Sequence, residues 1–411
     1  MPDVIVVGGG AAGMMAAGTC AYYGANVTLL EKNSRTGRKI LVTGKGRCNI
    51  TNDCDKDTFL ENVPTNPRFL YSAINNFDSQ DTISFFNDLG LETKTERGNR
   101  VFPVSDRAMD VADTLYSYVK HNGVKVVEST VKSLITQGDK VTGVVDANGR
   151  EFFADSVIIA TGGMSYPGTG STGDGYALAK SVGHTVTNLM PSLVGLVSSD
   201  SFCGELQGLS LRNIALTAYE NNKVIYKDFG EMVFTHKGVS GPVVLSASAH
   251  MRHFDKKSYH ISLDLKPALS EEKLDLRLQR EFSNHINNQI NNSLKELLPK
   301  KLIPVIIKRW GIAETKKCNS ITKEERKTHL DLLKNFTVNI SSLGSLSEAI
   351  ITSGGISTKE INPKTMESKL ISNLFFCGEV IDVDAYTGGF NLQIAFSTGR
   401  LVGYYSAIKE G

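Results

Sequence analysis

The chain opens with a strand, a glycine turn and a helix, a pattern that few folds share. Its first apolar run, Val4–Val7, leads into the spacing G-x-G-x-x-G. Gly8 makes the tight turn, Gly10 lets a pyrophosphate approach the backbone, and Gly13 lets the helix pack closely on the strand. The free N–H groups of that helix attract phosphate. A second strand-like run ends at Glu31, 18 residues beyond Gly13, where a carboxylate can bind ribose hydroxyls. We therefore predict a dinucleotide site; the alternative is a glycine-rich turn in an ordinary parallel sheet.

The composition is typical of a globular enzyme. With 411 residues, the chain is too long for one simple core, so two or three domains are expected. The net charge of +2 gives no global field that attracts nucleic acid or a membrane. No apolar run approaches the ~20 residues needed to span a bilayer. The first apolar run belongs to the fingerprint, so we expect neither a secretory signal nor membrane association.

Six cysteines are scattered along the chain. The absence of a C-x-x-C pair argues against zinc, and no metal is expected. Reduced thiols in this arrangement favour a cytoplasmic location. Cys48 and Cys54 are separated by five residues, a longer spacing than that of the redox disulfide in glutathione-reductase-like enzymes. We therefore interpret Cys48 as a small residue packed near the cofactor.

The two ends of the chain share one residue pattern, and the middle has another. Residues 1–31 form a βαβ unit, and residues 34–53 form a glycine-rich, basic loop with a short helix. Residues 192–265 alternate like antiparallel strands, whereas residues 270–334 have the spacing of charged helices. The nucleotide-binding pattern of the first part of the chain returns at residues 354–411. The pattern predicts one nucleotide-binding domain, made from both chain ends, with a two-part insertion.

A second glycine turn follows the buried strand Val157–Ile159. Dense glycine at the carboxyl end of a strand keeps side chains away from a close ligand. We expect the next helix to begin near Gly175 and interpret Asp174 as its N-cap, in preference to a substrate contact.

A third segment, Phe375–Ala395, has the same design. A strand ends at Gly378-Glu379, and the final helix opens at Gly388-Gly389. A helix N-terminus at this point stabilises negative charge on a reduced flavin ring. The acids Asp382 and Asp384 between them are interpreted as ligands of ribityl hydroxyls; the alternative is a solvated turn.

With these segments, the chain resembles a bacterial family of NAD(P)/FAD-dependent oxidoreductases. That family includes aminoacetone oxidases, bile-acid ene-reductases and flavoproteins that form dihydrouridine in ribosomal RNA. The resemblance covers almost the whole chain, and one of its segments is also similar to fumarate-reductase-type flavoproteins. The matching motifs are Gly37–Leu41, Thr43–Asn52, Ala160–Gly163, Thr169–Gly175, Phe234–Pro242, Thr365–Lys369 and Gly378–Gln393.

The resemblance implies an α/β fold with a Rossmann-like FAD-binding domain, an inserted small β-barrel domain and a helical subdomain. The FAD-binding domain would comprise residues 1–190 and 354–411. The barrel would comprise residues 191–268 and 335–353, and the helical subdomain residues 269–334.

The resemblance and the fingerprint together give a set of cofactor-binding residues for FAD. They are Gly8, Gly10, Ala11, Ala12, Gly13, Glu31, Lys32, Arg38, Lys39, Gly46, Cys48, Asn49, Thr51, Asn52, Val131, Ala160, Thr161, Gly162, Gly163, Gly378, Glu379, Asp382, Gly388, Gly389, Asn391 and Leu392. No second complete G-x-G-x-x-G unit is present, so NAD(P)H is expected as a transient reductant at the flavin.

The expected reaction is NAD(P)H-driven hydride transfer from reduced flavin to a carbon–carbon double bond, in a steroid-like enone or an rRNA uridine. An acid must protonate the second carbon, and the candidates are Tyr166, His236 and Tyr386. Each has an alternative role: Tyr166 packs on the flavin ring, His236 caps a turn, or Tyr386 belongs to a lid. An oxygen-dependent oxidase of aminoacetone is the second interpretation, and a non-catalytic flavin-binding module is the third.

RNA binding is a separate hypothesis, carried by charge. Residues 293–334 hold eleven basic and five acidic side chains, a net +6, whereas the rest of the chain is at −4. A basic insertion of this kind can bind phosphates; the alternative is a lysine-rich solvated helix face. Neither the substrate nor the oligomeric state follows from the sequence.

Overall fold

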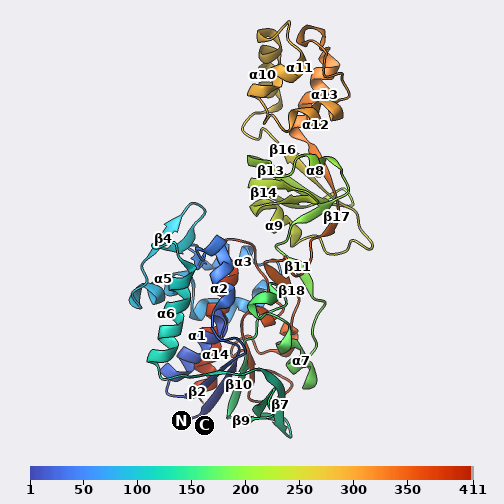
Figure 1. Cartoon of the computed structure of the whole chain (residues 1–411). Helices are drawn as coiled ribbons and strands as arrows, with labels where there is room; N and C mark the ends of the chain where they lie inside the picture. The colour runs from blue at the N-terminus through green and yellow to red at the C-terminus, as the bar shows by residue number, and fades with distance from the viewer. Residues whose placement is uncertain (409–411) are drawn as a thin grey trace. The chain divides into compact units, whose positions relative to one another are not determined.

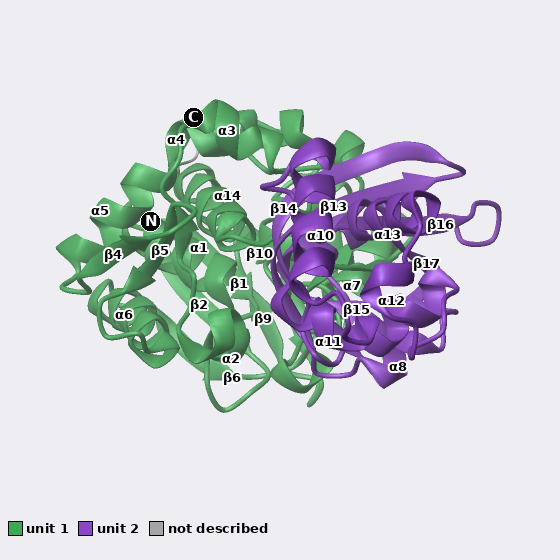
Figure 2. Ribbon diagram, turned by 90° about the horizontal axis from the view of Figure 1, so that it is seen from above, with its two compact units in different colours: residues 1–192, 345–411 green, residues 193–344 purple. Residues whose placement is uncertain are grey.

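The computed structural model describes residues 1–408, which fold into two compact units. Unit 1 contains Met1–Ser192 together with the chain from Ser345 onward, and unit 2 is Leu193–Gly344 (Figure 2). The first and last parts of the chain therefore build one body.

Unit 1 is organised around a five-stranded parallel sheet in the order β19-β10-β1-β2-β6. Strands β19, β10 and β1 are almost entirely buried, as expected where a parallel sheet is covered on both faces. Their bounds are β1 Asp3–Val7, β2 Asn26–Glu31, β6 Lys125–Glu128, β10 Ser156–Ile159 and β19 Leu374–Phe376. The chain order reverses at β1, because β2 lies on one side of it and β10 on the other.

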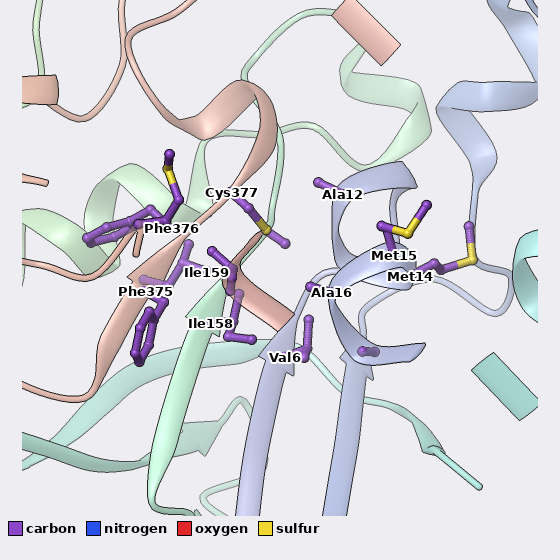
Figure 3. Packing of buried hydrophobic residues seen from close by; sticks show 14 of the residues in the cluster. Val6, Ala12, Met14, Met15, Ala16, Ile158, Ile159, Phe375, Phe376 and Cys377 are labelled. Atoms are coloured by element: carbon purple, nitrogen blue, oxygen red, sulfur yellow. The ribbon is translucent and has the colours of Figure 1, made fainter. Parts of the chain in front are cut away.

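Two helices, α1 (Ala11–Tyr22) and α14 (Phe390–Ala407), lie side by side in unit 1 (Figure 1). Small residues allow this approach: a Cβ on Gly399 of α14 would lie 2.5 Å from the Ala12 carbonyl oxygen. Figure 3 shows α1 side chains near the sheet, with Ile158 and Phe376 among the buried residues of the same core.

Shorter elements complete unit 1. The helices are α2 Arg38–Val42, α3 Lys56–Glu61, α4 Tyr71–Asn76, α5 Ser79–Asp88, α6 Ala108–His121 and α7 Asp174–Ser181, with 3-10 turns η1 Thr43–Gly46, η2 Pro67–Leu70, η3 Pro167–Thr169, η6 Thr358–Glu360 and η7 Gly378–Val380. The strands are β3 Thr51–Asn52, β4 Thr93–Glu96, β5 Arg100–Pro103, β7 Val131–Gln137, β8 Lys140–Asp146, β9 Glu151–Phe153, β11 Met190–Ser192 and β18 Ile351–Ser353.

Unit 2 combines a closed six-stranded antiparallel barrel with a group of helices. The barrel order is β12 Leu196–Ser198, β15 Gly238–Ser240, β14 Lys223–Thr235, β13 Ser210–Glu220, β16 Tyr259–Asp264 and β17 Phe336–Leu343. The remaining helices are α8 Phe202–Glu205, α9 Pro242–Ser248, α10 Glu271–Asn284, α11 Ile290–Ser293, α12 Ile303–Trp310 and α13 Lys323–Lys334, with 3-10 turns η4 Leu294–Glu296 and η5 Cys318–Ser320.

The barrel strands show the alternation of apolar residues that the sequence predicts. On β13 the buried residues Ile214, Leu216 and Ala218 recur at every second position. The second barrel segment expected from sequence, residues 335–353, differs in its last part, because β18 pairs with β11 in unit 1. A short apolar run indicates a strand but not its partner. Within residues 1–408, no helix has the length and apolar character needed to cross a membrane.

Candidate functional site

Four segments that are distant in sequence meet at the carboxyl edge of the parallel sheet. Gly8 follows β1, Ala160 follows β10, Gly378 lies just beyond β19, and Glu31 is the last residue of β2. Because all of these strands are parallel, their carboxyl ends share one edge. The reversal of strand order at β1 makes this edge the position where open α/β sheets bind ligands.

The glycines of the N-terminal turn divide into two kinds. A Cβ on Gly13 would lie 1.9 Å from the Gly8 carbonyl oxygen. A Cβ on Gly8 would lie 2.7 Å from the Ala160 carbonyl oxygen. These two glycines are needed for packing. A Cβ on Gly10 would meet nothing within 4 Å, so the backbone there borders open space. Ala11 and Ala12 continue from it as the first residues of α1.

The Glu31 carboxylate is held by the turn that it faces. Its Oε2 accepts a hydrogen bond from the Gly9 N–H (2.7 Å), and its Oε1 accepts from the backbone and side-chain amides of Asn33 (2.8 and 2.6 Å). Sequence reasoning identified Glu31 but missed Gly9 and Asn33. Val131 begins β7 shortly after Ser129, whose N–H donates to the Glu31 carbonyl (2.7 Å).

Basic residues after β2 connect this strand to the second glycine turn. Lys32 Nζ donates to the Asp174 carboxylate (2.6 Å), and Arg38 donates to the Asn33 side chain (2.8 Å). The N-cap interpretation of Asp174 is wrong: α7 begins at Asp174, and its cap is Gly173, at φ +83°. The carboxylate therefore pairs with Lys32 instead of capping a helix.

A mostly buried polar network joins three of the four segments. Lys39 Nζ donates to Glu379 Oε2 (2.6 Å) and to Ser165 Oγ (2.7 Å), and Ser165 Oγ donates to Glu379 Oε1 (3.0 Å). The Thr352 N–H also donates to Glu379 Oε1 (2.9 Å). A Cβ on Gly163 would lie 2.5 Å from the Thr352 hydroxyl, which explains the glycine there. Thr352 and Ser165 were not among the predicted residues, because no motif marks them.

The basic loop after α2 is fastened to the start of α14. Thr51 Oγ1 donates to the Gln393 side chain (2.6 Å), and Asn52 Nδ2 donates to the Gly388 carbonyl (3.0 Å). Gly389 has φ +101°, and a Cβ there would lie 2.4 Å from Thr51 backbone atoms. The loop and the helix N-terminus are therefore positioned as one piece.

Two predicted cofactor residues carry buried polar atoms that have no hydrogen-bond partner. They are Asn49 Oδ1 and Thr161 Oγ1. A buried polar atom without a partner is costly, which makes each of them a candidate ligand contact. At Gly46, as at Gly10, a Cβ would meet nothing within 4 Å. Open backbone at Gly10, where α1 begins, leaves room for the pyrophosphate of a dinucleotide, so the residues present fit FAD.

Cys48 is fully buried, and burial raises the pKa of its thiol to about 12. It has φ +60°, an uncommon conformation for a residue other than glycine. All six cysteines are free, Cys48 and Cys54 among them.

Other predicted residues shape the loop before α14. Asn391 accepts from the Ala385 N–H (3.0 Å) and donates to the Ala385 carbonyl (2.8 Å), and so holds that loop closed. The Asp382 carbonyl accepts from Asn66 (2.7 Å). Asp384 is fully buried, where it accepts hydrogen bonds from two serine hydroxyls. Leu392 is partly buried in the first turn of α14, and Gly162 has φ +71° beside Ser171.

The three candidate proton donors lie in different settings. Tyr166 is 36 % exposed at φ +51°, immediately after Ser165. Tyr386 is half-buried, and its N–H donates to the Asn62 carbonyl (3.0 Å). His236 is exposed in the hairpin between β14 and β15 and belongs to unit 2, whereas the four converging segments belong to unit 1.

Comparison with known proteins identifies the class. The profile of the HI0933-like protein Rossmann domain matches residues 2–405. The chain is 31% identical over 415 aligned positions to the 3-dehydro-bile acid delta(4,6)-reductase of Clostridium scindens, covering 99% of both chains. It is 32% identical over 405 positions to the ribosomal RNA dihydrouridine synthase of Haemophilus influenzae, covering 96% of both. The solved 3-ketosteroid delta1-dehydrogenase of Sterolibacterium denitrificans shares the fold, with a TM-score of 0.55 at 13% identity over 99% of both chains.

The fold and the site therefore define a flavin-dependent oxidoreductase with a Rossmann-like FAD-binding domain. The chain belongs to the HI0933-like family. The predicted fold class, with its parallel sheet, closed barrel and helices, is confirmed.

Proposed function

We propose that this protein uses FAD and NAD(P)H to reduce a carbon–carbon double bond, in a bile-acid-like enone or in a uridine of ribosomal RNA. The similarity over nearly the full length to a bile-acid reductase and to a dihydrouridine synthase carries the proposal. In each of those named conversions the product gains two hydrogens across a double bond. A shared reductive half-reaction with different acceptors explains why one fold serves both.

Bound FAD supplies hydride chemistry at its N5 atom. The chain contributes the anchor: a helix N-terminus beside Gly10 for phosphates, and the fixed Glu31 carboxylate for the ribose. Asn49 and Thr161 offer unsatisfied buried oxygens to the same ligand. The Lys39–Glu379 pair fixes the loop after β19 relative to the loop after β2.

Reduction of the double bond also needs a proton donor for the second carbon. Within unit 1, Tyr386 is presented from a loop whose backbone is held by Asn62 and Asn391. We therefore rank Tyr386 first as the donor. Tyr166 is second, since it is more exposed, and His236 is third, since its side chain is exposed in the hairpin between β14 and β15.

The charge of the helical insertion gives limited support to an RNA substrate. Three of its eleven basic side chains pair with carboxylates: Lys316 with Glu325, Arg326 with Asp275, and Lys334 with Asp264. Exposed lysines, among them Lys323 and Lys327 on α13, remain available to phosphate. If they bind RNA, the affinity falls steeply with rising salt.

Anaerobic mixing of the FAD-loaded protein with NADH, NADPH and aminoacetone, in parallel, tests the proposal. We expect one or both nicotinamides to bleach the flavin, and aminoacetone to leave it oxidised. Bleaching by aminoacetone alone would establish the oxidase. No bleaching by any of the three would favour a non-catalytic flavin-binding role. The six free, scattered thiols support a reducing, cytoplasmic setting for this reaction.

A further inference from the structure

Unit 2 contains a cavity of about 140 Å³ where the barrel meets its helical insertion. Strand β13 and the end of β16 form one side, and the segment before α12 forms the other. The lining residues are Ser210, Leu211, Arg212, Ile214, Leu265, Lys266, Leu298, Pro299 and Leu302. None of them belongs to the cofactor site of unit 1.

Two cations line this cavity without a counter-ion. Within residues 1–408, neither the Lys266 ammonium nor the Arg212 guanidinium has a hydrogen bond or an ion pair. Lys266 is partly buried, and burial, followed by the nearby Arg277 charge, lowers the pKa of its ammonium. Arg277 has its own carboxylate at 3.4 Å, that of Glu281. Lys266 is therefore a partly desolvated cation near the positive charge of Arg277, and an anion bound beside it would stabilise its charged form.

An irregularity in β13 accompanies this arrangement. The register with β14 shifts between Leu211 and Ile214, and Asn213 has φ +55°. Bulges of this kind redirect side chains and occur often beside binding sites. Arg212 lies within the irregularity, where it is exposed yet lines the cavity.

The rest of the wall is apolar. Leu211, Ile214, Leu265, Leu298 and Leu302 are all buried. The cavity is partly open to solvent, and its volume of about 140 Å³ is close to that of a cavity that holds a benzene molecule (~150 Å³), so it has room for a tail of about six carbons. Its chemistry is therefore divided, with positive charge in one part and aliphatic side chains in the rest.

We propose that this cavity binds a small organic anion with a short apolar tail, with Lys266 and Arg212 holding the anionic group. The leucine and isoleucine side chains take the tail. This site is separate from the proposed reductase site and does not depend on the reaction carried out there.

Isothermal titration of the FAD-loaded protein with hexanoate tests the proposal, with hexylamine as the matched cation. We expect hexanoate to bind at one site and hexylamine not to bind. Rising salt should weaken the binding of hexanoate, because part of the attraction is between charges. Lys266→Met and Arg212→Gln should each lower the affinity for hexanoate by about tenfold. Lys256→Met, at an exposed lysine of unit 2 outside the lining, should leave the affinity unchanged.

Equal binding of hexylamine and hexanoate to the unaltered protein would overturn the proposal without any variant. So would undiminished hexanoate affinity in the Arg212→Gln/Lys266→Met double variant, with folding checked by circular dichroism. Loss of flavin reduction by NAD(P)H in that variant would overturn the separation of the two sites.

Discussion

Unit 1 and unit 2 are constrained by different physics. In unit 1, glycines sit where a side chain would collide with backbone, as at Gly13 and Gly389. Unit 2 has such a glycine at Gly238, but its barrel is filled mainly by alternating apolar residues, as along β13. Steric constraints mark individual positions, whereas alternation admits many residues at each position. More single positions are therefore fixed by steric constraints in unit 1 than in unit 2.

The largest expected effect comes from the two kinds of glycine in the N-terminal turn. Gly13→Ala places a Cβ 1.9 Å from the Gly8 carbonyl oxygen, so α1 must shift away from the sheet. We expect the free energy of unfolding to fall by about 3 kcal/mol. Urea unfolding of the FAD-free protein measures this loss.

Gly10→Ala is the matched control, because its Cβ meets no protein atom within 4 Å and its φ of −78° suits alanine. The stability of the FAD-free protein should change by less than about 0.5 kcal/mol. FAD affinity should nevertheless fall by about tenfold or more, since the methyl group enters the space left for the pyrophosphate. Full FAD retention by this variant would contradict the assignment of Gly10.

The next largest effect is expected from breaking the Lys39–Glu379 ion pair. The two side chains are only 23% and 15% exposed, so removing one partner leaves a poorly solvated charge. Glu379→Gln should reduce the free energy of unfolding by about 2–3 kcal/mol. The double variant Lys39→Met/Glu379→Gln should recover part of that loss, since no charge is then unpaired. Strictly additive losses would show that the pair is not coupled.

In unit 2, His329 should make stability depend on pH. Its ring is fully buried against Trp310, neither nitrogen has a partner, and burial lowers its pKa to about 3. The unfolded chain binds a proton near pH 6.5, so stability is complete above that pH and is lost as the pH falls toward 3. At pH 5 the loss should be about 2 kcal/mol.

Trp310, the single tryptophan of the chain, reports the unfolding of unit 2 by its fluorescence. His329→Phe keeps a ring against Trp310 and cannot be protonated. The difference in stability between the two proteins should therefore grow as the pH falls from 6.5 to 5, while His184 and His260 contribute equally to both. A difference that does not vary with pH would contradict the prediction.

The cysteines give the smallest expected effect. Cys54 is partly buried, and burial raises the pKa of its thiol to about 11. At neutral pH neither Cys54 nor Cys48 is a thiolate to any useful extent. Cys54→Ser should leave the rate of flavin reduction by NAD(P)H unchanged in stopped-flow measurements. A large loss of rate would revive the redox-disulfide interpretation.

Much of unit 1 could be predicted from sequence, because its motifs are local. Gly8, Gly10 and Gly13 fall within six residues, and the role of Glu31 follows from its distance along the chain. The partners of Glu379 could not be predicted: Thr352 lies in a strand that joins unit 1 only after the insertion. In the same way, Arg212 and Lys266 line one cavity through barrel closure, which no spacing encodes. The N-cap prediction at Asp174 failed for a different reason: Gly173 occupies the N-cap of α7, and Asp174 is the first residue of the helix.

The oxidative half-reaction tests the proposed reductase most directly. The protein is reduced anaerobically with NAD(P)H and then mixed with a bile-acid-like enone, or with ribosomal RNA in a parallel experiment. We predict that one of the two acceptors restores the oxidised flavin without oxygen and yields one reduced product for each flavin. Flavin that stays reduced with both acceptors and is reoxidised only when oxygen is admitted would contradict the account.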